Sequence, residues 1–448
     1  MLCAVLEKPK RLVVKEREIP RIREGEILIR VAACAICGTD VKKYFRGHRL
    51  IKSYPIVPGH ELSGEIVAVG RKAREIEVKT EGGREIRRFN EGERVVIAPV
   101  IACESCRNCL EGLPESCGFR EDFGFSYDGG FEEYTVIPEK LLKKKINPII
   151  PIPENVPFYM AAISEPYACA LHAHKKLVRP GRWDMQREEY GMIRGIGEGD
   201  VVVVIGGGPL GCMHAELAKI SGAETVVIAQ HSKERLEMIK RLGVADRYVF
   251  NQSTEDLVDA VDELTDGRGA DVVITATSST VAQLQALKIA RQGGVVSFFG
   301  GVSKNLVEIP TNKIHYNGPF ITGTSGASPR HIPIILRLMA EGRLDATKYI
   351  THLLGLHMLE RVLTVKGIPA FESLDDVISI RGKDFLDFLY EEKLDLSGRQ
   401  TLRERVKAFK DSILKALVVP SLSDEEGIIA LSKMPIEERR KFLNNLIT

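Results

Sequence analysis

Residues 201–211 read VVVVIGGGPLG, and this stretch decides the fold of half of the chain. Its β-branched run is typical of a buried strand, and helical spacing begins at Pro209. The glycines between them follow the pattern G-x-G-x-x-G, which is informative only where it joins a strand to a helix, as here. The expected roles are a tight turn at Gly206, close approach of the backbone to a pyrophosphate at Gly208, and close helix–strand packing at Gly211. We predict that a dinucleotide binds at the N-terminus of this helix.

The chain after residue 211 keeps alternating between strand and helix patterns. Apolar runs at 225–229, 271–275 and 294–299 predict strands, and the stretches 233–242 and 280–291 have helical spacing. Such alternation indicates the α/β class with a doubly wound parallel sheet. We place this Rossmann-type domain at residues 166–313. Residues 182–198, which contain the only tryptophan, Trp183, are interpreted as an inserted loop.

Residues 1–165 have a different, mostly β character. Short alternating runs such as 26–31 and 94–98 are separated by Gly, Pro and Asp turns. The highly charged segment 71–93 predicts a long, solvated hairpin. A separate N-terminal β domain therefore precedes the α/β domain.

Four cysteines form a tight string with the spacing C-x2-C-x2-C-x7-C. They are Cys103, Cys106, Cys109 and Cys117. Four thiolates suit a closed, tetrahedral structural zinc site. Chance clustering and a disulfide pair are the alternatives, but without a secretory signal a metal site is favoured over a disulfide framework.

The composition fits a soluble globular enzyme. The chain has 448 residues, a hydrophobic content of 44%, a charged content of 28% and a net charge of +2, which gives no electrostatic case for nucleic acid or membrane as a partner. The first residues are charged early and lack the apolar core of a signal peptide. We expect a reducing, cytoplasmic location, a small-molecule alcohol or ketone substrate, and a homodimer or homotetramer.

A second metal set is spread along the chain. Cys37, His60 and Glu165 offer one thiolate, one imidazole and one carboxylate, a sensible set for a catalytic zinc that keeps one position open. Sequence spacing alone does not show that they meet. Singly, each has a plain structural alternative: a buried thiol, a satisfied histidine and a helix entrance.

These motifs together resemble the zinc-dependent medium-chain dehydrogenase/reductase family. The shared motifs, in family order, are Cys37-Gly38-Thr39-Asp40, Pro58-Gly59-His60-Glu61, the four-cysteine lobe, Asp128-Gly129-Gly130-Phe131, Glu165-Pro166 and the glycine pattern at 206–211. The resemblance covers about residues 2–360. It is nearest to the sorbitol and polyol (or polyol-phosphate) branch, because Glu165 stands where simple alcohol dehydrogenases have cysteine.

The resemblance implies a GroES-like β domain with the Rossmann domain inserted and the active site in the cleft between them. The β domain would comprise residues 1–165 and a returning segment, 314–365. Cys37, His60 and Glu165 would hold the catalytic zinc, so that the chain carries two zinc ions. Glu61 would be an alternate or water-bridged ligand, and Asp40 would orient a ligand. Thr39 would exchange the proton of the substrate hydroxyl.

The resemblance also implies an NAD(P) site. The cofactor would contact Gly206, Gly208, Pro209, Leu210 and Gly211, and its carboxamide end would lie near Thr275, Gly300 and Thr322. The second strand ends without the acidic residue usual in NAD enzymes. Gln230, His231 and Ser232 stand there, with Lys233 next. His231, Ser232 and Lys233 suit a 2′-phosphate and favour NADP, whereas Gln230 suits the ribose of NAD equally well.

Two further features depart from the family pattern. Lys42 stands where alcohol dehydrogenases often have a relay histidine; His48 is a nearby substitute, but a solvated loop residue is the favoured interpretation. Residues 366–448 run past the usual end. Spacing at Leu402, Val406, Phe409, Ile413 and Leu417 predicts an amphipathic helix, 423–426 resembles a capping box, and Pro435 suits the first turn of another helix. We therefore expect a helical C-terminal extension.

The leading function is an oxidoreductase that transfers a hydride between a secondary alcohol of a polyol, sugar or sugar phosphate and NAD(P). A threonine-type or other small-alcohol dehydrogenase ranks lower, because residues 44–54 lack a Trp-rich segment. A zinc-ribbon binding protein without redox activity is the alternative of another class. It is disfavoured because Glu104 and Glu111 flank Arg107 and no basic-aromatic stripe follows.

Overall fold

The computed structural model describes residues 1–80, 83–302, 306–367, 413–422, 428–432 and 434–447. The chain divides into two compact units. The first unit comprises Met1–Glu165 and Ser328–Thr448, and the second comprises Pro166–Ala327. The second unit thus continues beyond residue 313, where we expected the return to the β domain.

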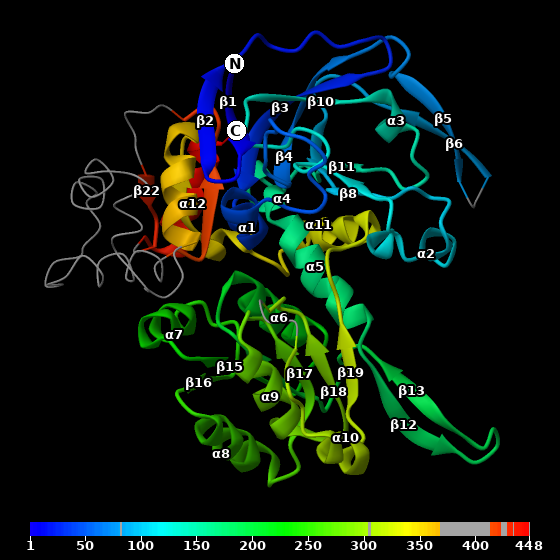
Figure 1. The fold of residues 1–448 in the computed structure, drawn as a ribbon, viewed down its shortest axis with the longest axis vertical. Helices are drawn as coiled ribbons and strands as arrows, with labels where there is room; N and C mark the ends of the chain where they lie inside the picture. The colour runs from blue at the N-terminus through cyan, green and yellow to red at the C-terminus, as the bar shows by residue number, and fades with distance from the viewer. Residues whose placement is uncertain (81–82, 303–305, 368–412, 423–427, 433, 448) are drawn as a thin grey trace, which may run out of the picture. The chain divides into compact units, whose positions relative to one another are not determined.

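The first unit is built on an antiparallel-rich eight-stranded sheet (Figure 1). Its order is β11 (Ile149–Pro151), β7 (Arg94–Ile97), β4 (Glu61–Val69), β3 (Ile27–Ala35), β21 (Lys415–Val418), β20 (Ile350–Leu354) and β22 (Ile428–Ala430), with β10 (Tyr134–Ile137) on β3. Separate two-stranded pairs are β1 (Leu2–Lys8) with β2 (Arg11–Glu16), β5 (Glu75–Thr80) with β6 (Gly83–Arg88), and β8 (Val100–Ile101) with β9 (Glu121–Asp122). The β5–β6 pair confirms the predicted charged hairpin.

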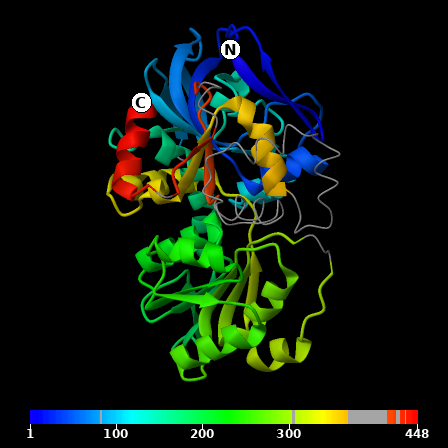
Figure 2. The ribbon, with the colours of Figure 1, turned by 90° about the vertical axis from the view of Figure 1, so that its left-hand side faces the viewer.

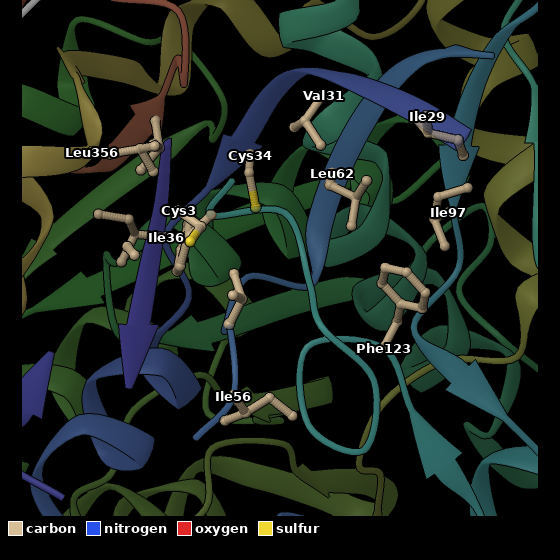
Figure 3. Close-up of a cluster of buried hydrophobic side chains, with 14 of the residues drawn as sticks. Cys3, Ile29, Val31, Cys34, Ile36, Ile56, Leu62, Ile97, Phe123 and Leu356 are labelled. Atoms are coloured by element: carbon tan, nitrogen blue, oxygen red, sulfur yellow. The ribbon is translucent and has the colours of Figure 1, made fainter. Parts of the chain in front are cut away.

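Short helices complete the first unit. They are α1 (Gly38–Arg46), α2 (Arg107–Leu110), α3 (Glu139–Leu142), α4 (Phe158–Ala162), α11 (Ile332–Ala340), α12 (Leu359–Gly367) and α16 (Ile436–Leu446). Alternate residues of the strands point into one buried core, in which Cys34, Leu62 and Phe123 are fully buried (Figure 3). This core fixes the register of β3 against β4, which matters for the site described below.

The second unit is a six-stranded parallel sheet with helices on both faces (Figures 1 and 2). Its strand order is β16 (Arg247–Phe250), β15 (Thr225–Gln230), β14 (Val201–Ile205), β17 (Ala270–Thr275), β18 (Ala290–Phe298) and β19 (Phe320–Gly323). Its helices are α6 (Pro209–Ile220), α7 (Lys233–Lys240), α8 (Thr254–Thr265), α9 (Thr280–Ile289) and α10 (Thr311–Asn317), and α5 (Ser164–Lys175) runs in from the first unit. The predicted doubly wound sheet is confirmed.

Two expectations about irregular segments need correction. Residues 182–198 are largely not a loop: β12 (Val178–Asp184) pairs with β13 (Glu189–Arg194) in a hairpin that projects from the second unit (Figure 1). The helix expected through Ile413 and Leu417 is also wrong where the chain is described. Leu417 belongs to β21, which lies between β3 and β20 and is buried along its whole length.

The remaining tail predictions have mixed outcomes. Residues 402–412 and the capping box at 423–426 lie outside the described residues. The helix expected near Pro435 is present as α16, which begins directly after that proline. Within the described part of the chain, no helix is long and apolar enough to cross a membrane.

Candidate metal centres and cofactor loop

The four cysteines of the lobe 103–117 come together. Their sulfur atoms all lie within 4.8 Å of one another. The Sγ atoms of Cys106 and Cys109 are 3.5 Å apart, and those of Cys103 and Cys109 are 3.8 Å apart. These separations are far beyond the roughly 2.05 Å of a disulfide bond, so the cluster is a cage of free thiols. The predicted structural zinc site has the donor set and spacing that zinc requires.

Backbone geometry prepares these thiols for a cation. The backbone N–H of Cys106 donates to the Sγ of Cys103 at 3.3 Å, and the N–H of Cys103 donates to the Sγ of Cys117 at 3.4 Å. Hydrogen bonds from the backbone of Ser105 and Cys106 lower the pKa of Cys103 to about 6. Donors aimed at sulfur stabilise the thiolate, which is the form that binds metal.

A second group of ligand atoms forms in the core of the first unit. Strand β3 leads to Cys37, which is the N-cap of α1, while His60 immediately precedes β4. Because Ala35 pairs with Glu61 in the β3–β4 register, the ends of the two segments meet. The ligand atoms of Cys37, His60 and Glu61 lie within 4.8 Å of one another. The predicted convergence of Cys37 with His60 is therefore present.

Asp40 holds both Cys37 and His60. The backbone N–H of Cys37 donates to Asp40 Oδ2 at 3.0 Å, and Asp40 Oδ1 lies 3.2 Å from His60 Nδ1. Burial opposes the charged imidazolium, but the Asp40 carboxylate outweighs it and raises the pKa of His60 well above its usual value. With Nδ1 directed at a carboxylate, the ring leaves Nε2 for a metal, an arrangement common for metal-bound histidines.

Two buried lysines flank this group, and neither role was predicted from the sequence. Lys43 Nζ donates to Asp40 Oδ1 at 2.9 Å. Lys415 Nζ, from β21, donates to Glu61 Oε1 at 2.6 Å and also contacts its Oε2. Burial opposes charge on Lys415, but the Glu61 carboxylate outweighs it and raises the pKa of the lysine. No sequence signal marks Lys415, because it lies in a segment whose spacing suggested a helix.

The other predicted catalytic residues lie nearby on the same unit. Glu165 is buried in the first turn of α5, and its charge helps to raise the pKa of Lys415. It does not belong to the group of ligand atoms from Cys37, His60 and Glu61 that lie within 4.8 Å of one another. Thr39 is half-buried on α1, and Lys42 is exposed on the same helix. Burial, with Lys43 nearby, lowers the pKa of His48 to about 4, so His48 is neutral near pH 7.

The glycine loop of the second unit has the predicted geometry. Gly206 has φ +116°, a conformation that favours glycine. A Cβ at Gly211 would lie 1.8 Å from the carbonyl oxygen of Gly206, so the close packing at this position leaves room for glycine only. At Gly208, among the described residues, a Cβ would meet no atom within 4 Å, so the backbone is open to a ligand. Pro209 and Leu210 begin α6.

The residues after β15 are partly engaged within the protein. Gln230 is buried, and its Oε1 accepts the N–H of Gly207 at 3.1 Å. Ser232 caps α7 and its hydroxyl donates to Glu234 at 3.2 Å. His231 and Lys233 are exposed. Glu234 was not predicted as a functional residue from the sequence, because it lies beyond the end of the strand.

The three predicted carboxamide-end residues lie at or just beyond the carboxyl ends of neighbouring strands. Thr275 ends β17 and is fully buried, and its carbonyl accepts the N–H of Gly300 at 2.7 Å. Thr322 pairs with Ser297 in the register of β19 against β18. The fold therefore brings these positions to the same edge of the sheet as the glycine loop.

Comparisons with known proteins agree with both units. The family model "Alcohol dehydrogenase GroES-like domain" matches residues 23–148, and "Zinc-binding dehydrogenase" matches residues 209–341. L-galactonate-5-dehydrogenase of Escherichia coli (strain K12) is 30% identical over 348 residues, covering 78% of this chain and 90% of that protein. L-threonine 3-dehydrogenase of Yersinia pestis (strain Pestoides F) is 31% identical over 335 residues, covering 74% and 86%.

A solved structure extends the likeness to the whole architecture. A short chain alcohol dehydrogenase from E. coli CFT073, complexed with NADH, is 27% identical. It superimposes with a TM-score of 0.67 and covers 94% of this chain and 99% of that chain.

Proposed function

The chain belongs to the zinc-dependent medium-chain alcohol dehydrogenase family, and on this premise we propose that it interconverts a secondary alcohol of a polyol, sugar or sugar phosphate with the corresponding ketone. The observation that carries the proposal is the convergence of Cys37, His60 and Glu61 within 4.8 Å. A polyhydroxylated substrate is supported by the L-galactonate-5-dehydrogenase relative and by Glu165 at a position that favours the polyol branch.

The residues present fit a catalytic zinc. Cys37 and His60 supply sulfur and nitrogen donors, and a carboxylate completes a three-ligand set. We assign that carboxylate to Glu165, because both oxygens of Glu61 are engaged by Lys415. Glu61 then serves as an alternate ligand. A zinc ion held there would act as a Lewis acid that makes a substrate hydroxyl easier to deprotonate.

The protein's own groups position the reaction. Asp40 fixes the His60 ring through Nδ1, at 3.2 Å, and fixes the start of α1 through the Cys37 N–H. Thr39, half-buried on the first turn of α1, exchanges the proton of the substrate hydroxyl. A bound NAD(P) would supply the hydride chemistry through its nicotinamide, and the Gly206–Gly211 loop would hold the pyrophosphate of that dinucleotide.

An experiment can distinguish which of the two carboxylates, Glu165 or Glu61, is the zinc ligand. We expect Glu165→Gln to reduce the zinc retained after mild chelation from two ions to one per chain, because a direct ligand is lost. Glu61→Gln should retain two, since its carboxylate is paired with Lys415. Elemental analysis of the two variants in parallel measures this; the reverse pattern would assign the ligand to Glu61.

The proposed reaction is tested with a substrate panel. The full chain is incubated with polyols, sugar acids, sugar phosphates and threonine, each with NAD and with NADP, and nicotinamide absorbance is followed. We expect turnover with a polyhydroxylated secondary alcohol and no turnover by Cys37→Ala. Turnover with threonine alone would favour the threonine-type alternative. Two bound zinc ions with no redox activity would favour a binding protein.

The same panel decides the cofactor. We propose a preference for NADP, supported by the exposed His231 and Lys233 after β15. Glu234 opposes this preference, because its carboxylate lies beside Ser232 and repels a 2′-phosphate. We expect Glu234→Gln to raise kcat/KM for NADP relative to NAD; a change in the opposite direction would place the 2′ site elsewhere.

A further inference from the structure

Lys43 is a fully buried lysine of the first unit. Its side chain is 0% exposed, whereas its neighbour Lys42 on α1 points to solvent. Burying an ammonium group costs free energy unless it is paired and hydrogen-bonded. The proposed chemistry uses Cys37, His60, Thr39 and a carboxylate and gives Lys43 no part, so this buried charge needs an explanation.

The contacts of Lys43 converge on one point. Its Nζ donates to Asp40 Oδ1 at 2.9 Å and to the carbonyl oxygen of Gly124 at 2.9 Å. It lies 3.3 Å from His60 Nδ1 and 3.4 Å from the centroid of the Phe125 ring. Two acceptors, Asp40 Oδ1 and the carbonyl oxygen of Gly124, and the face of the Phe125 ring therefore hold the ammonium group in place.

Asp40 Oδ1 is shared between the lysine and the histidine. His60 Nδ1 lies 3.2 Å from this oxygen and Lys43 Nζ lies 2.9 Å from it. A lysine ammonium is only a donor and an ionised carboxylate only an acceptor. Both nitrogens therefore compete for the negative charge of a single oxygen atom.

That competition bears on the metal. A carboxylate hydrogen-bonded to a metal-ligating histidine raises the basicity of the ring and strengthens its bond to the metal. A fixed cation on the same carboxylate offsets this effect. Resting on the proposed function for its metal, we propose that Lys43 is a positioning residue of the metal centre at Cys37 and His60 that weakens the donation of His60 to the bound ion.

The sign of this effect separates it from a packing role. In Lys43→Met, Asp40 keeps two donors, the Cys37 N–H at 3.0 Å and His60 Nδ1. If Lys43 withdraws charge, its removal gives His60 the full carboxylate, and the metal is held more tightly. If Lys43 only supports the local packing, its removal loosens the site and the metal leaves faster.

The experiment measures zinc release to a chromogenic chelator from the folded full chain. Wild type should release zinc in two phases, and the phase missing from Cys37→Ser belongs to this centre. We expect zinc release in that phase to be about tenfold slower in Lys43→Met. This is the lower end of the changes in metal affinity that follow mutation of groups that orient metal ligands. Lys43→Arg, which retains the charge, and Lys42→Met, which changes an exposed neighbour, should match wild type.

An unchanged or faster phase in Lys43→Met overturns the proposal. Should this variant not fold, Lys43→Gln decides in the same way, since its amide can still donate to Gly124 while the charge is gone. Asp40→Asn provides the coupled test, because Lys43→Gln should no longer slow release once the shared carboxylate is neutral. If wild type itself shows a single phase that Cys37→Ser retains, the proposed function fails instead, and the two failures are distinct.

Discussion

The two candidate metal centres of the first unit are built in opposite ways. The lobe 103–117 takes all four ligands from one short loop, and three of its cysteines are only half-buried. The second centre combines residues from β3–α1 and β4, with Glu165 proposed as its third ligand, and Glu61 at its centre is fully buried. It also has two buried lysines against its carboxylates. A closed set of thiolates suits a structural role, whereas mixed ligands with charged neighbours suit chemistry.

A site built from one loop and a site built from distant segments therefore depend on different parts of the structure. The lobe is formed by its own short turns around its four cysteines. Loss of one of these cysteines should therefore lower the free energy of unfolding. The second centre needs the whole register of the sheet, so changes there should separate activity from folding. Substitutions at each centre test this contrast.

Cys37→Ala should remove nearly all activity while leaving the fold in place. We expect kcat/KM to fall by about 10⁴-fold, equivalent to about 5 kcal/mol, because a Lewis acid is worth several kcal/mol to the reaction. The thermal transition should stay close to that of wild type. Steady-state kinetics and calorimetry on the same preparation measure both quantities. A variant that unfolds would show that this centre is structural.

Cys106→Ala should act in the opposite sense. Loss of a metal is among the few mechanisms that cost about 4 kcal/mol or more of stability. We expect the free energy of unfolding to fall by about that amount, and the chain to bind one zinc ion fewer. The fraction that remains folded should keep its kcat. Denaturant unfolding with elemental analysis measures this, and a large fall in kcat at unchanged stability would contradict the division of roles.

Lys415→Met should destabilise the first unit by about 3 kcal/mol, because it leaves the buried Glu61 carboxylate without its counter-charge. The matched control is Arg107→Met on the lobe. Arg107 forms an exposed ion pair with Glu111 at 2.7 Å, and breaking it should cost less than about 1 kcal/mol. Equal costs in denaturant unfolding would mean that burial does not distinguish the two centres.

The sequence predicted the parts of the molecule that are encoded locally. Residues 201–211 gave the strand, turn and helix as observed, because β-branched spacing and a glycine turn are decided within a few residues. The cage at Cys103–Cys117 was predicted for the same reason. Strands β16 and β19 and helix α8 were not predicted, since short or mixed segments depend on the sheet that they join.

The charged surroundings of the second centre could not be predicted from the sequence. Lys43 gave no signal beside the exposed Lys42, because helix phase alone does not say which lysine faces the core. Lys415 was placed on a helix by the spacing of Ile413 and Leu417, but Leu417 lies in β21 between β3 and β20, and Ile413 is buried just before that strand. Tertiary pairing overrode the local pattern there.

Strand β21 also has a bearing on biosynthesis. It separates β3 from β20 in the sheet order and brings the counter-ion of Glu61 from near residue 415. A ribosome-bound chain that has not yet exposed this strand has the two halves of the sheet unjoined and an unpaired acid at the metal centre. The sheet of the first unit can therefore be completed only after the ribosome has synthesised β21.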